Sequence, residues 1–388
     1  VSGALIGTGQ ITWPDGTVEK LSASKQLMSA EVEEDKEDDE VEEETAETLE
    51  SPTPLFGINY PLGMFGVDKV PDTIPCVAFT NVTIWTCGPQ RIIESGTVVI
   101  RDGVIVAVGT DIRTPKDAVV VDGRGMHLTP GVIDCHSHMA TDGGVNEGTQ
   151  AVTAEVRIGD FVDANDVNIF RQLAGGVTTS NILHGSANPI GGQNQVIKLR
   201  WGSLGEEMKF SEAPAGIKFA LGENVKQSNW GDEYTTRYPQ SRLGVEQIMR
   251  DTFRRAIQYQ DKWESWVKRK DGPAPRRDLE LDAIVQILNG DRWIHCHSYR
   301  QDEILALIRT LDKHDVTIGT FQHVLEGYKV APEMAKHGAM GSAFSDWWAY
   351  KYEVFDAIPY NGALMYRAGV VVSFNSDDRE LARHLNHE

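Results

Sequence analysis

Two histidines stand one residue apart at the end of a strand-like run. The segment 131–138, GVIDCHSH, passes through Val132 and Ile133 before it reaches His136 and His138. Residues i and i+2 of a β-strand project to the same face, so we expect both imidazoles to enter one space. Two converging neutral imidazoles suit a borderline metal such as zinc, although an isolated pair also occurs as hydrogen-bonded polar residues in a turn.

Four further residues of metal-ligand type fall on other strand-like runs. They are Lys218 in AGIKFALG, His295 in WIHCHS, His323 in GTFQHV and Asp377 in SFNSDD. Each of them alone has an ordinary structural explanation, because a strand lysine often snorkels and a strand histidine is often a satisfied core group. Whether the six side chains converge therefore depends on how the strands that carry them are arranged.

From residue 131 onward, strand-like and helix-like segments alternate, which is typical of βα units and a parallel sheet. Eight strand-like runs, with QVIKLRW as the third, are found in 131–388. This number and length predict an α/β fold of the (β/α)8 barrel type, with its active site at the C-terminal strand ends. The longest interruption, roughly 223–290, is expected to pass over the barrel mouth.

The residues before the barrel divide into three segments. Residues 76–130 contain short alternating strands and a DG turn at Asp102 and Gly103, which predict a partial β-sandwich domain. Residues 1–30 contain two strand-like runs around a PDG turn and have no assigned role. Residues 31–75 are predicted to be an acidic disordered linker followed by a Pro/Gly-rich connection.

Charge is concentrated in that linker. Residues 31–50 hold thirteen carboxylates against Lys36, so they contribute −12 of the net charge of −20 and the remainder contributes −8. A block of this kind buries little apolar surface, although it could also serve as an acidic binding tail. The acidity argues against a nucleic-acid partner, for which a basic patch is expected.

The bulk composition is that of a globular protein, with 40% hydrophobic and 24% charged residues. No apolar run approaches the roughly 18 residues of a membrane helix, so no membrane partner is expected. The four cysteines form no CxxC pair and no disulfide-scaffold pattern. The sequence is compatible with a homo-oligomer and does not indicate the cellular compartment.

In this order and on these strands, the six residues resemble the amidohydrolase superfamily. Its members carry HxH on strand 1, a lysine or glutamate on strand 4, histidines on strands 5 and 6, and an aspartate on strand 8. RDGVIVAVG, LTPGVIDCHSH, GGVTT and the Ser376–Asp377 pair are similar to the branch that contains imidazolonepropionase and the prolidase-type peptidases. The resemblance covers about residues 76–388.

This resemblance implies a site with one or two divalent ions, of which zinc is the expected metal. It places His136, His138 and Asp377 on one ion and His295 and His323 on the other, with a carbamate on Lys218 as the bridge. Glu223 is an alternative to Lys218, and His297 is an alternative to His295. Such ions lower the pKa of a bound water to about 7, and Asp377 would pass its proton to the leaving nitrogen.

The loops beside these strands offer candidates for substrate contacts. NILHGSANPIGGQ supplies His184, Asn188 and Gln193, and His297 shares a face with His295. The same loop residues could equally cap the barrel structurally. The loop SDWWAYKYE could line the pocket with Trp347, Trp348 and Tyr350, unless these aromatic residues simply pack together.

These features predict a metal-dependent hydrolase that cleaves a C–N bond of a small cyclic amide or a dipeptide-like substrate. The rivals are a mononuclear deaminase-type enzyme of the same fold and a catalytically silent binding module. Because the sequence ends eleven residues after Asp377, the resemblance also implies a truncated barrel and sandwich. An exposed sheet edge is then expected around residues 97–121.

Overall fold

A computed structural model of the chain describes residues 5–12, 18–25, 73–141, 143–227, 230–231, 233, 237–345, 347 and 349–388. The chain divides into two compact units, Val1–Asn59 and Tyr60–Glu388. In the first unit, β1 (Leu5–Thr12) and β2 (Val18–Lys25) pair antiparallel, where the sequence predicts two strands. The acidic block and residues 51–72 of the connection lie outside the described residues.

The second unit begins with a small sheet of short strands. Its strand order is β5-β4-β3-β6, and β7 also pairs with β3. The two-residue turn at Asp102 and Gly103 has φ angles of 49° and 78°, as a tight hairpin requires. The strands are β3 (Cys76–Trp85), β4 (Ile92–Arg101), β5 (Val104–Gly109), β6 (Val119–Asp122) and β7 (His127–Leu128).

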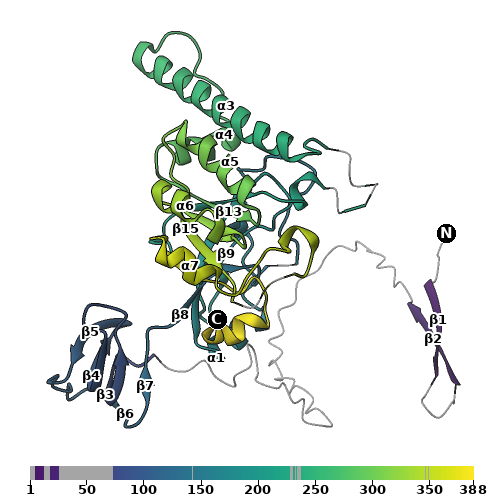
Figure 1. The fold of residues 1–388 in the computed structure, drawn as a ribbon. Helices are drawn as coiled ribbons and strands as arrows, with labels where there is room; N and C mark the ends of the chain where they lie inside the picture. The colour runs from purple at the N-terminus through teal and green to yellow at the C-terminus, as the bar shows by residue number, and fades with distance from the viewer. Residues whose placement is uncertain are drawn as a thin grey trace, which may run out of the picture. The chain divides into compact units, whose positions relative to one another are not determined.

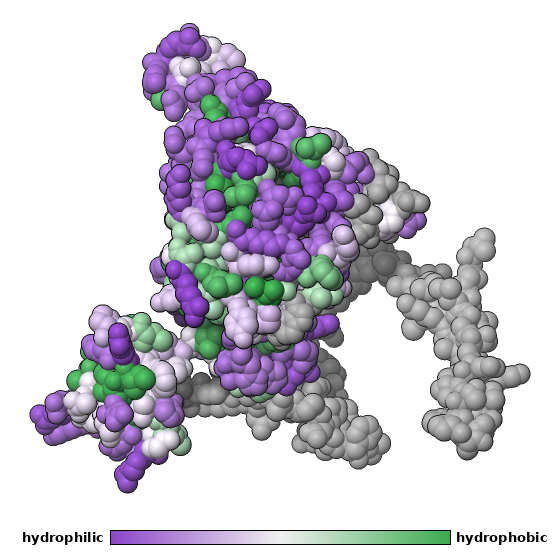
Figure 2. All heavy atoms as spheres, viewed as in Figure 1, coloured by the Kyte–Doolittle hydropathy of each residue, from purple (hydrophilic) through white to green (hydrophobic). Residues whose placement is uncertain are grey.

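The described residues of this region form one sheet and no second layer of a sandwich. The edge strands β5 and β6 expose apolar side chains, with Val104 62% and Val120 55% accessible. Figure 2 shows a green, apolar patch on the small sheet. The expected exposed edge is therefore present in the structure.

The remaining strands and helices alternate along the chain (Figure 1). The strands are β8 (Val132–Ser137), β9 (Val177–Ile182), β10 (Ile190–Gln193), β11 (Gln195–Lys198), β12 (Gly216–Ala220), β13 (Trp293–Ser298), β14 (Thr320–His323), β15 (Met340–Ala343) and β16 (Val372–Phe374). The helices are α1 (Val167–Ala174), α2 (Gly205–Met208), α3 (Arg242–Arg269), α4 (Leu279–Leu288), α5 (Gln301–Asp312), α6 (Ala331–His337) and α7 (Asn361–Arg367).

The strand pairing corrects the prediction of eight parallel strands. β12 to β16 form one parallel ladder and β8 pairs parallel with β9, but β11 runs antiparallel to β9. A parallel crossover usually needs a dozen or more residues with a helix, and residues 183–194 between β9 and β11 contain no helix. The ladders therefore make two sheets and not one closed ring.

One segment joins these two sheets. Residues 190–198 pair with β12 through β10 and with β9 through β11. Between the two pairings, the backbone N–H of Asn194 donates to the Gly216 carbonyl at 3.2 Å. The mixed α/β architecture thus keeps β8, β9 and β12 to β16 around one interior.

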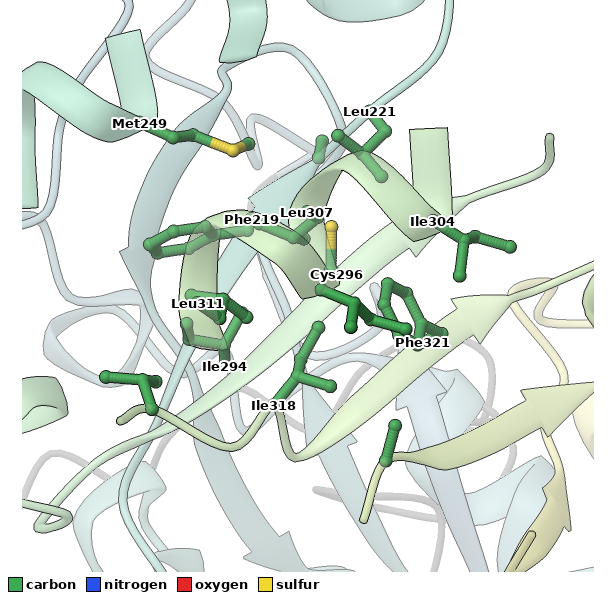
Figure 3. Packing of buried hydrophobic residues seen from close by; sticks show 14 of the residues in the cluster. Phe219, Leu221, Met249, Ile294, Cys296, Ile304, Leu307, Leu311, Ile318 and Phe321 are labelled. Carbon is green, nitrogen blue, oxygen red and sulfur yellow. The ribbon is translucent and has the colours of Figure 1, made fainter. Parts of the chain in front are cut away.

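The core lies between the outer faces of the strands and the helices. Figure 3 shows Phe219, Cys296 and Phe321, from three neighbouring strands, packed against side chains of α5 such as Leu307. The first half of α3 joins this layer through Val245, Met249, Phe253 and Ala256, all of which are buried. The helix α3 of the long interruption therefore belongs to the outer layer, whereas Arg237, before this helix, contacts the loop carbonyls of Gly148 and Ala187.

Strand alternation turns the remaining residues of these strands inward. Because Ile217 and Phe219 face the helices, Lys218 faces the interior, and His295 and His297 do so on β13 for the same reason. No helix in the described part of the chain is long and apolar enough to cross a membrane.

Candidate metal centre

His136, His138 and Asp377 form a group whose ligand atoms all lie within 4.8 Å of one another. Asp377 Oδ1 is 3.1 Å from His138 Nε2 and 3.4 Å from His136 Nε2. The two imidazoles stand edge to face with their centroids 5.0 Å apart. The convergence predicted from their i, i+2 spacing on the first strand is therefore present.

Each of these two rings is oriented through its other nitrogen. His138 Nδ1 lies 2.7 Å from the Leu183 carbonyl oxygen, and His136 Nδ1 lies 3.1 Å from Gln322 Oε1. Because a carbonyl oxygen only accepts hydrogen bonds, each Nδ1 donates, and the lone pair of each Nε2 points toward Asp377. This tautomer is the one that a metal-binding imidazole needs.

Lys218 enters the same space from β12. Its side chain is 1% exposed, and its Nζ donates to His136 Nε2 at 3.1 Å. Burial lowers the pKa of Lys218 to about 8, against the opposing effect of the Asp377 carboxylate. Glu223 lies beyond the strand, where its backbone N–H donates to Glu353, and none of its described contacts is with a site histidine.

His323 completes the wall of the site opposite Lys218. Its ring centroid is 4.6 Å from that of His136, and its Nε2 is 3.7 Å from Asp377 Oδ2. Regular alternation would turn His323 outward with Phe321, but its φ of 67° turns it back toward the interior. Burial lowers the pKa of His323 to about 3, so its imidazole is neutral.

The two histidines of β13 lie at different depths. The His297 ring is 4.7 Å from the His323 ring, and its buried Nε2 has no hydrogen-bond partner. His295 packs instead over Gly216, where a Cβ would lie 2.7 Å from its Nε2. The structure thus brings His297 beside His323, whereas the described ring contacts of the site do not include His295.

The three loop residues predicted to contact substrate differ in their surroundings. Asn188 Nδ2 donates to the Glu147 carbonyl and to Thr153 Oγ1, both at 2.9 Å, and Gln193 Nε2 donates to the Ala154 carbonyl. These two amides hold the neighbouring loop in place. Burial lowers the pKa of His184, whose Nδ1 lies 3.0 Å from the Val145 carbonyl oxygen, and the carbonyl of the preceding residue Leu183 contacts His138.

An aromatic wall extends from His323 through the loop after β15. Phe344 stacks on His323 with centroids 5.3 Å apart, and Trp347 stacks on Phe344 at 4.3 Å. Tyr350 lies 5.7 Å from Trp347 and donates a hydrogen bond from its hydroxyl to that of Tyr299 at 2.9 Å. Trp347 and Tyr350 therefore pack together beside the site, their pocket-lining role stays a prediction, and Trp348 lies outside the described residues.

Sequence reasoning missed three residues beside the site. Gln322 orients His136, Tyr299 packs 4.4 Å from the His297 ring, and Lys351 holds its Nζ 4.5 Å above the Tyr299 ring. Gln322 and Tyr299 follow from strand alternation only once the pairing register is known. Lys351 stands within the SDWWAYKYE loop, where only the aromatic residues had suggested a function.

Open space adjoins the metal-ligand residues. A cavity of about 480 Å³ is lined by His138 and Asp377, together with Asp163, Asp166 and Arg379. A larger cavity of about 900 Å³ lies between α3 and α4 and contains none of the site residues. The smaller cavity therefore gives a small molecule access to His138 and Asp377.

Comparison with known proteins agrees with this geometry. No protein-family profile matches the chain. The chain is 29% identical to Amidohydrolase tasK from Hapsidospora irregularis over 324 residues, which are 75% of this chain and 32% of that protein. It is 38% identical to imidazolonepropionase from Acidiphilium cryptum over 69 residues, which are 16% of this chain and 17% of that enzyme.

A solved structure of similar extent also matches. The crystal structure of an amidohydrolase from Thermotoga maritima is 29% identical to the chain, with a TM-score of 0.72 and coverage of 80% of each chain. These similarities support assignment of the chain to the amidohydrolase superfamily. The chain spans about a third of the length of the Hapsidospora protein.

Proposed function

We propose that the chain is a metal-dependent hydrolase that cleaves an amide C–N bond of a small cyclic amide or a dipeptide-like substrate. The observation that carries this proposal is the convergence of His136, His138 and Asp377 within 4.8 Å. Lys218 and His323 border the same space, at 3.1 Å from His136 Nε2 and 3.7 Å from Asp377 Oδ2. The names of the relatives support a hydrolase of C–N bonds.

The chemistry of the donor groups fits one or two divalent ions. Burial lowers the pKa of His136 and His323, so both imidazoles are neutral and can donate lone pairs. Burial favours the protonated form of Asp377, but the neighbouring histidines together with the positive charge of Lys218 outweigh this effect and lower its pKa to about 2. The buried His297 Nε2 and His323 Nδ1 also have no hydrogen-bond partner, as ligand atoms without their ion would.

The residues divide into two ligand groups. His136, His138 and Asp377 would hold one ion, and His323 would hold a second with a histidine from β13. We assign that histidine as His297, which lies 4.7 Å from His323, and keep His295 as the alternative. A bound zinc ion supplies a water of lowered pKa and polarises the amide carbonyl.

Lys218 is proposed to bridge the two ions as a carbamate. Carbamate formation joins the neutral amine to carbon dioxide and releases one proton, so it requires a lysine that loses its proton readily. The lowered pKa of about 8 provides such an amine near neutral pH. Because Lys218 lies beside His136, the carboxylate oxygens of such a carbamate would lie near the proposed ligands.

Asp377 is proposed to move the proton during hydrolysis. It is ionised at neutral pH, and its two oxygens face His138 and His323 from the cavity side. The carboxylate would accept the proton of the attacking water and return it to the leaving nitrogen, a role typically worth about 10² to 10⁴ in rate. We propose His184 as the loop residue that contacts the substrate.

The zinc-loaded chain should be assayed against N-acyl amino acids, dipeptides and cyclic amides, with metal content measured in parallel. Hydrolysis of at least one amide with two ions bound supports the binuclear enzyme. One bound ion together with release of ammonia from an amidine-type substrate would favour the mononuclear deaminase. If the metal-loaded protein hydrolyses none of these substrates, the catalytically silent binding module would be the remaining interpretation.

A further inference from the structure

A lysine stands at the edge of the metal-ligand residues. Lys351 belongs to the loop between β15 and α7, and its side chain is 25% exposed. Its Nζ lies over the Tyr299 ring, and that ring is 4.4 Å from the His297 ring and 5.9 Å from the His323 ring, which places the Lys351 ammonium close to the site. Lys218 is assigned to the metal bridge, whereas Lys351, beside Tyr299, and Arg379, in the cavity at Asp377, can meet a substrate.

The ammonium group is held in a fixed position. It lies 4.5 Å from the centre of the Tyr299 ring and 2.8 Å from Glu353 Oε1. The second oxygen of Glu353 accepts from Arg242 and from the backbone N–H of Glu223, both at 3.1 Å. The Glu353 side chain is 2% exposed, so this anchor is buried.

The charges of this anchor balance internally. Arg242 bridges Glu303 at 2.7 Å and Glu353 at 3.1 Å, and Lys351 adds the second cation. In the described part of the chain, Glu353 is the one carboxylate within ion-pair distance of Lys351. An ammonium has three N–H donors, so two of them remain for a ligand.

The surroundings of the ammonium suit an organic anion with an apolar part. Tyr350 is 50% exposed, and with Trp347 it continues the aromatic wall from His323 past Lys351. Tyr299, beneath the ammonium, packs 4.4 Å from His297. A molecule that reaches Asp377 along this wall therefore passes both a flat apolar surface and a fixed positive charge.

We propose that Lys351 binds a carboxylate of the substrate and so selects amides that carry a carboxylate near the scissile bond, such as N-acyl amino acids with an apolar side chain. The selection of amide substrates rests on the proposed hydrolase function. The binding itself depends only on Lys351 and the aromatic wall. A binding measurement can therefore test carboxylate binding by Lys351 independently of the hydrolase function.

The test uses the zinc-loaded chain and two probes without an amide bond, 3-phenylpropanoate and the neutral 3-phenylpropan-1-ol, with Kd measured by calorimetry. The parent should prefer the carboxylate by at least about tenfold, which corresponds to roughly 1.4 kcal/mol. Lys351→Met should remove that preference, and Lys351→Arg should keep most of it. Thermal melting of each variant checks that the fold is intact.

Lys329→Met is the matched control. Lys329 is 29% exposed, pairs with Glu326 at 3.3 Å and lies over the Tyr328 ring, but it is not part of the site. This control should bind both probes like the parent. A parent without preference for the carboxylate, or a preference that survives in Lys351→Met because the zinc alone binds the anion, would overturn the inference.

A kinetic comparison separates this result from the proposed function. If the parent hydrolyses N-acetyl-phenylalanine, Lys351→Met should raise its KM at least about tenfold and leave the KM of the neutral N-acetyl-phenylalaninamide unchanged. Equal effects on both amides would contradict carboxylate selection. A parent that binds 3-phenylpropanoate through Lys351 but hydrolyses no amide would refute the hydrolase and retain the carboxylate site.

Discussion

Asp377 and His323 both reach the site through backbone conformations that non-glycine residues seldom adopt. Their φ angles are 47° and 67°, in the left-handed region that costs an L-residue roughly 1–2 kcal/mol. The Asp377 backbone is held there by a hydrogen bond from its N–H to the His136 carbonyl at 3.1 Å. This strain destabilises the fold, but it is needed at the site, because a regular strand would point both side chains away from His136 and His138.

Asp377→Asn tests the proton-transfer role at this residue. The amide keeps the shape of the carboxylate but cannot accept the proton, so the rate of hydrolysis should fall by about 10² to 10⁴. Metal content should fall far less, since the histidines and Lys218 remain. The check is kcat together with the number of ions per chain, and a variant that holds its ions and hydrolyses at the parent rate would exclude this role.

The two histidines of β13 can be distinguished by metal analysis. His297→Ala should lose about one ion per chain, because its ring lies beside His323, whereas His295→Ala should retain the parent metal content. The measurement is equilibrium dialysis against zinc followed by elemental analysis. Loss of an ion in His295→Ala alone would return the ligand role to His295.

Lys218→Ala and Glu223→Ala form a second pair. The first variant should lose the bridge and at least one ion, since Lys218 Nζ lies 3.1 Å from His136 Nε2. The second should keep its metal, because the described contacts of Glu223 point to Glu353 and not to the histidines. The same zinc dialysis distinguishes the two residues. Loss of metal in Glu223→Ala but not in Lys218→Ala would identify Glu223 as the metal ligand.

How far the sequence could predict these residues depends on the backbone. Same-face spacing is enough to pair His136 with His138, and the structure confirms that pairing. The same rule puts His295 and His297 on one face but cannot tell their depth, which depends on the register with Gly216 and His323. The position of Lys351 could not be predicted, because it depends on the ring of Tyr299, which is distant in sequence, as well as on the nearby Glu353.

At the scale of elements, one side chain links β8 to the end of β16. Asp134 accepts hydrogen bonds from the Ser376 backbone N–H at 3.1 Å and from the Ser376 hydroxyl at 2.5 Å. The ladders do not pair these two strands directly. The buried carboxylate therefore supports the approach of Asp377 to His136 and His138.

Asp134 should make stability depend on pH. Burial raises its pKa from 3.8 to about 6, although the hydrogen bonds from Ser376 oppose this shift. Since the folded chain binds this proton more tightly than the unfolded chain, the contribution to stability is complete below about pH 4 and is lost as the pH rises through 6. The loss is about 3 kcal/mol for a shift of this size.

Asp134→Asn should remove this dependence. Urea unfolding of the metal-free chain between pH 4 and 7 should show the parent losing about 3 kcal/mol of unfolding free energy relative to the variant. Curves for parent and variant that run parallel across this range would show that Asp134 does not titrate as described.

The strand elements were predicted more accurately than their pairing. Seven of the eight expected strands occur in parallel ladders, because apolar runs with turn residues around them identify strands well. The direction of β11 could not be inferred from its composition. It follows from the short link 183–194, which leaves no room for a crossover helix.

At the scale of the whole molecule, the charge and the chemistry lie in different parts of the chain. All candidate site residues belong to the unit Tyr60–Glu388, whereas residues 31–50, with their charge of −12, belong to Val1–Asn59. Deletion of residues 31–50 should therefore change Tm and metal content little, because so charged a segment contributes little burial. A large drop in Tm by calorimetry would show that the acidic block is bound to the folded chain.

The zinc stoichiometry of the purified chain tests the central claim most directly. After dialysis against zinc and removal of excess metal, the parent should retain two ions per chain, and the double variant His136→Asn/His138→Asn should lose at least one of them with its fold intact by circular dichroism. A parent that retains no zinc, or a double variant that retains as much as the parent, would contradict the metal centre on which the proposed hydrolase depends.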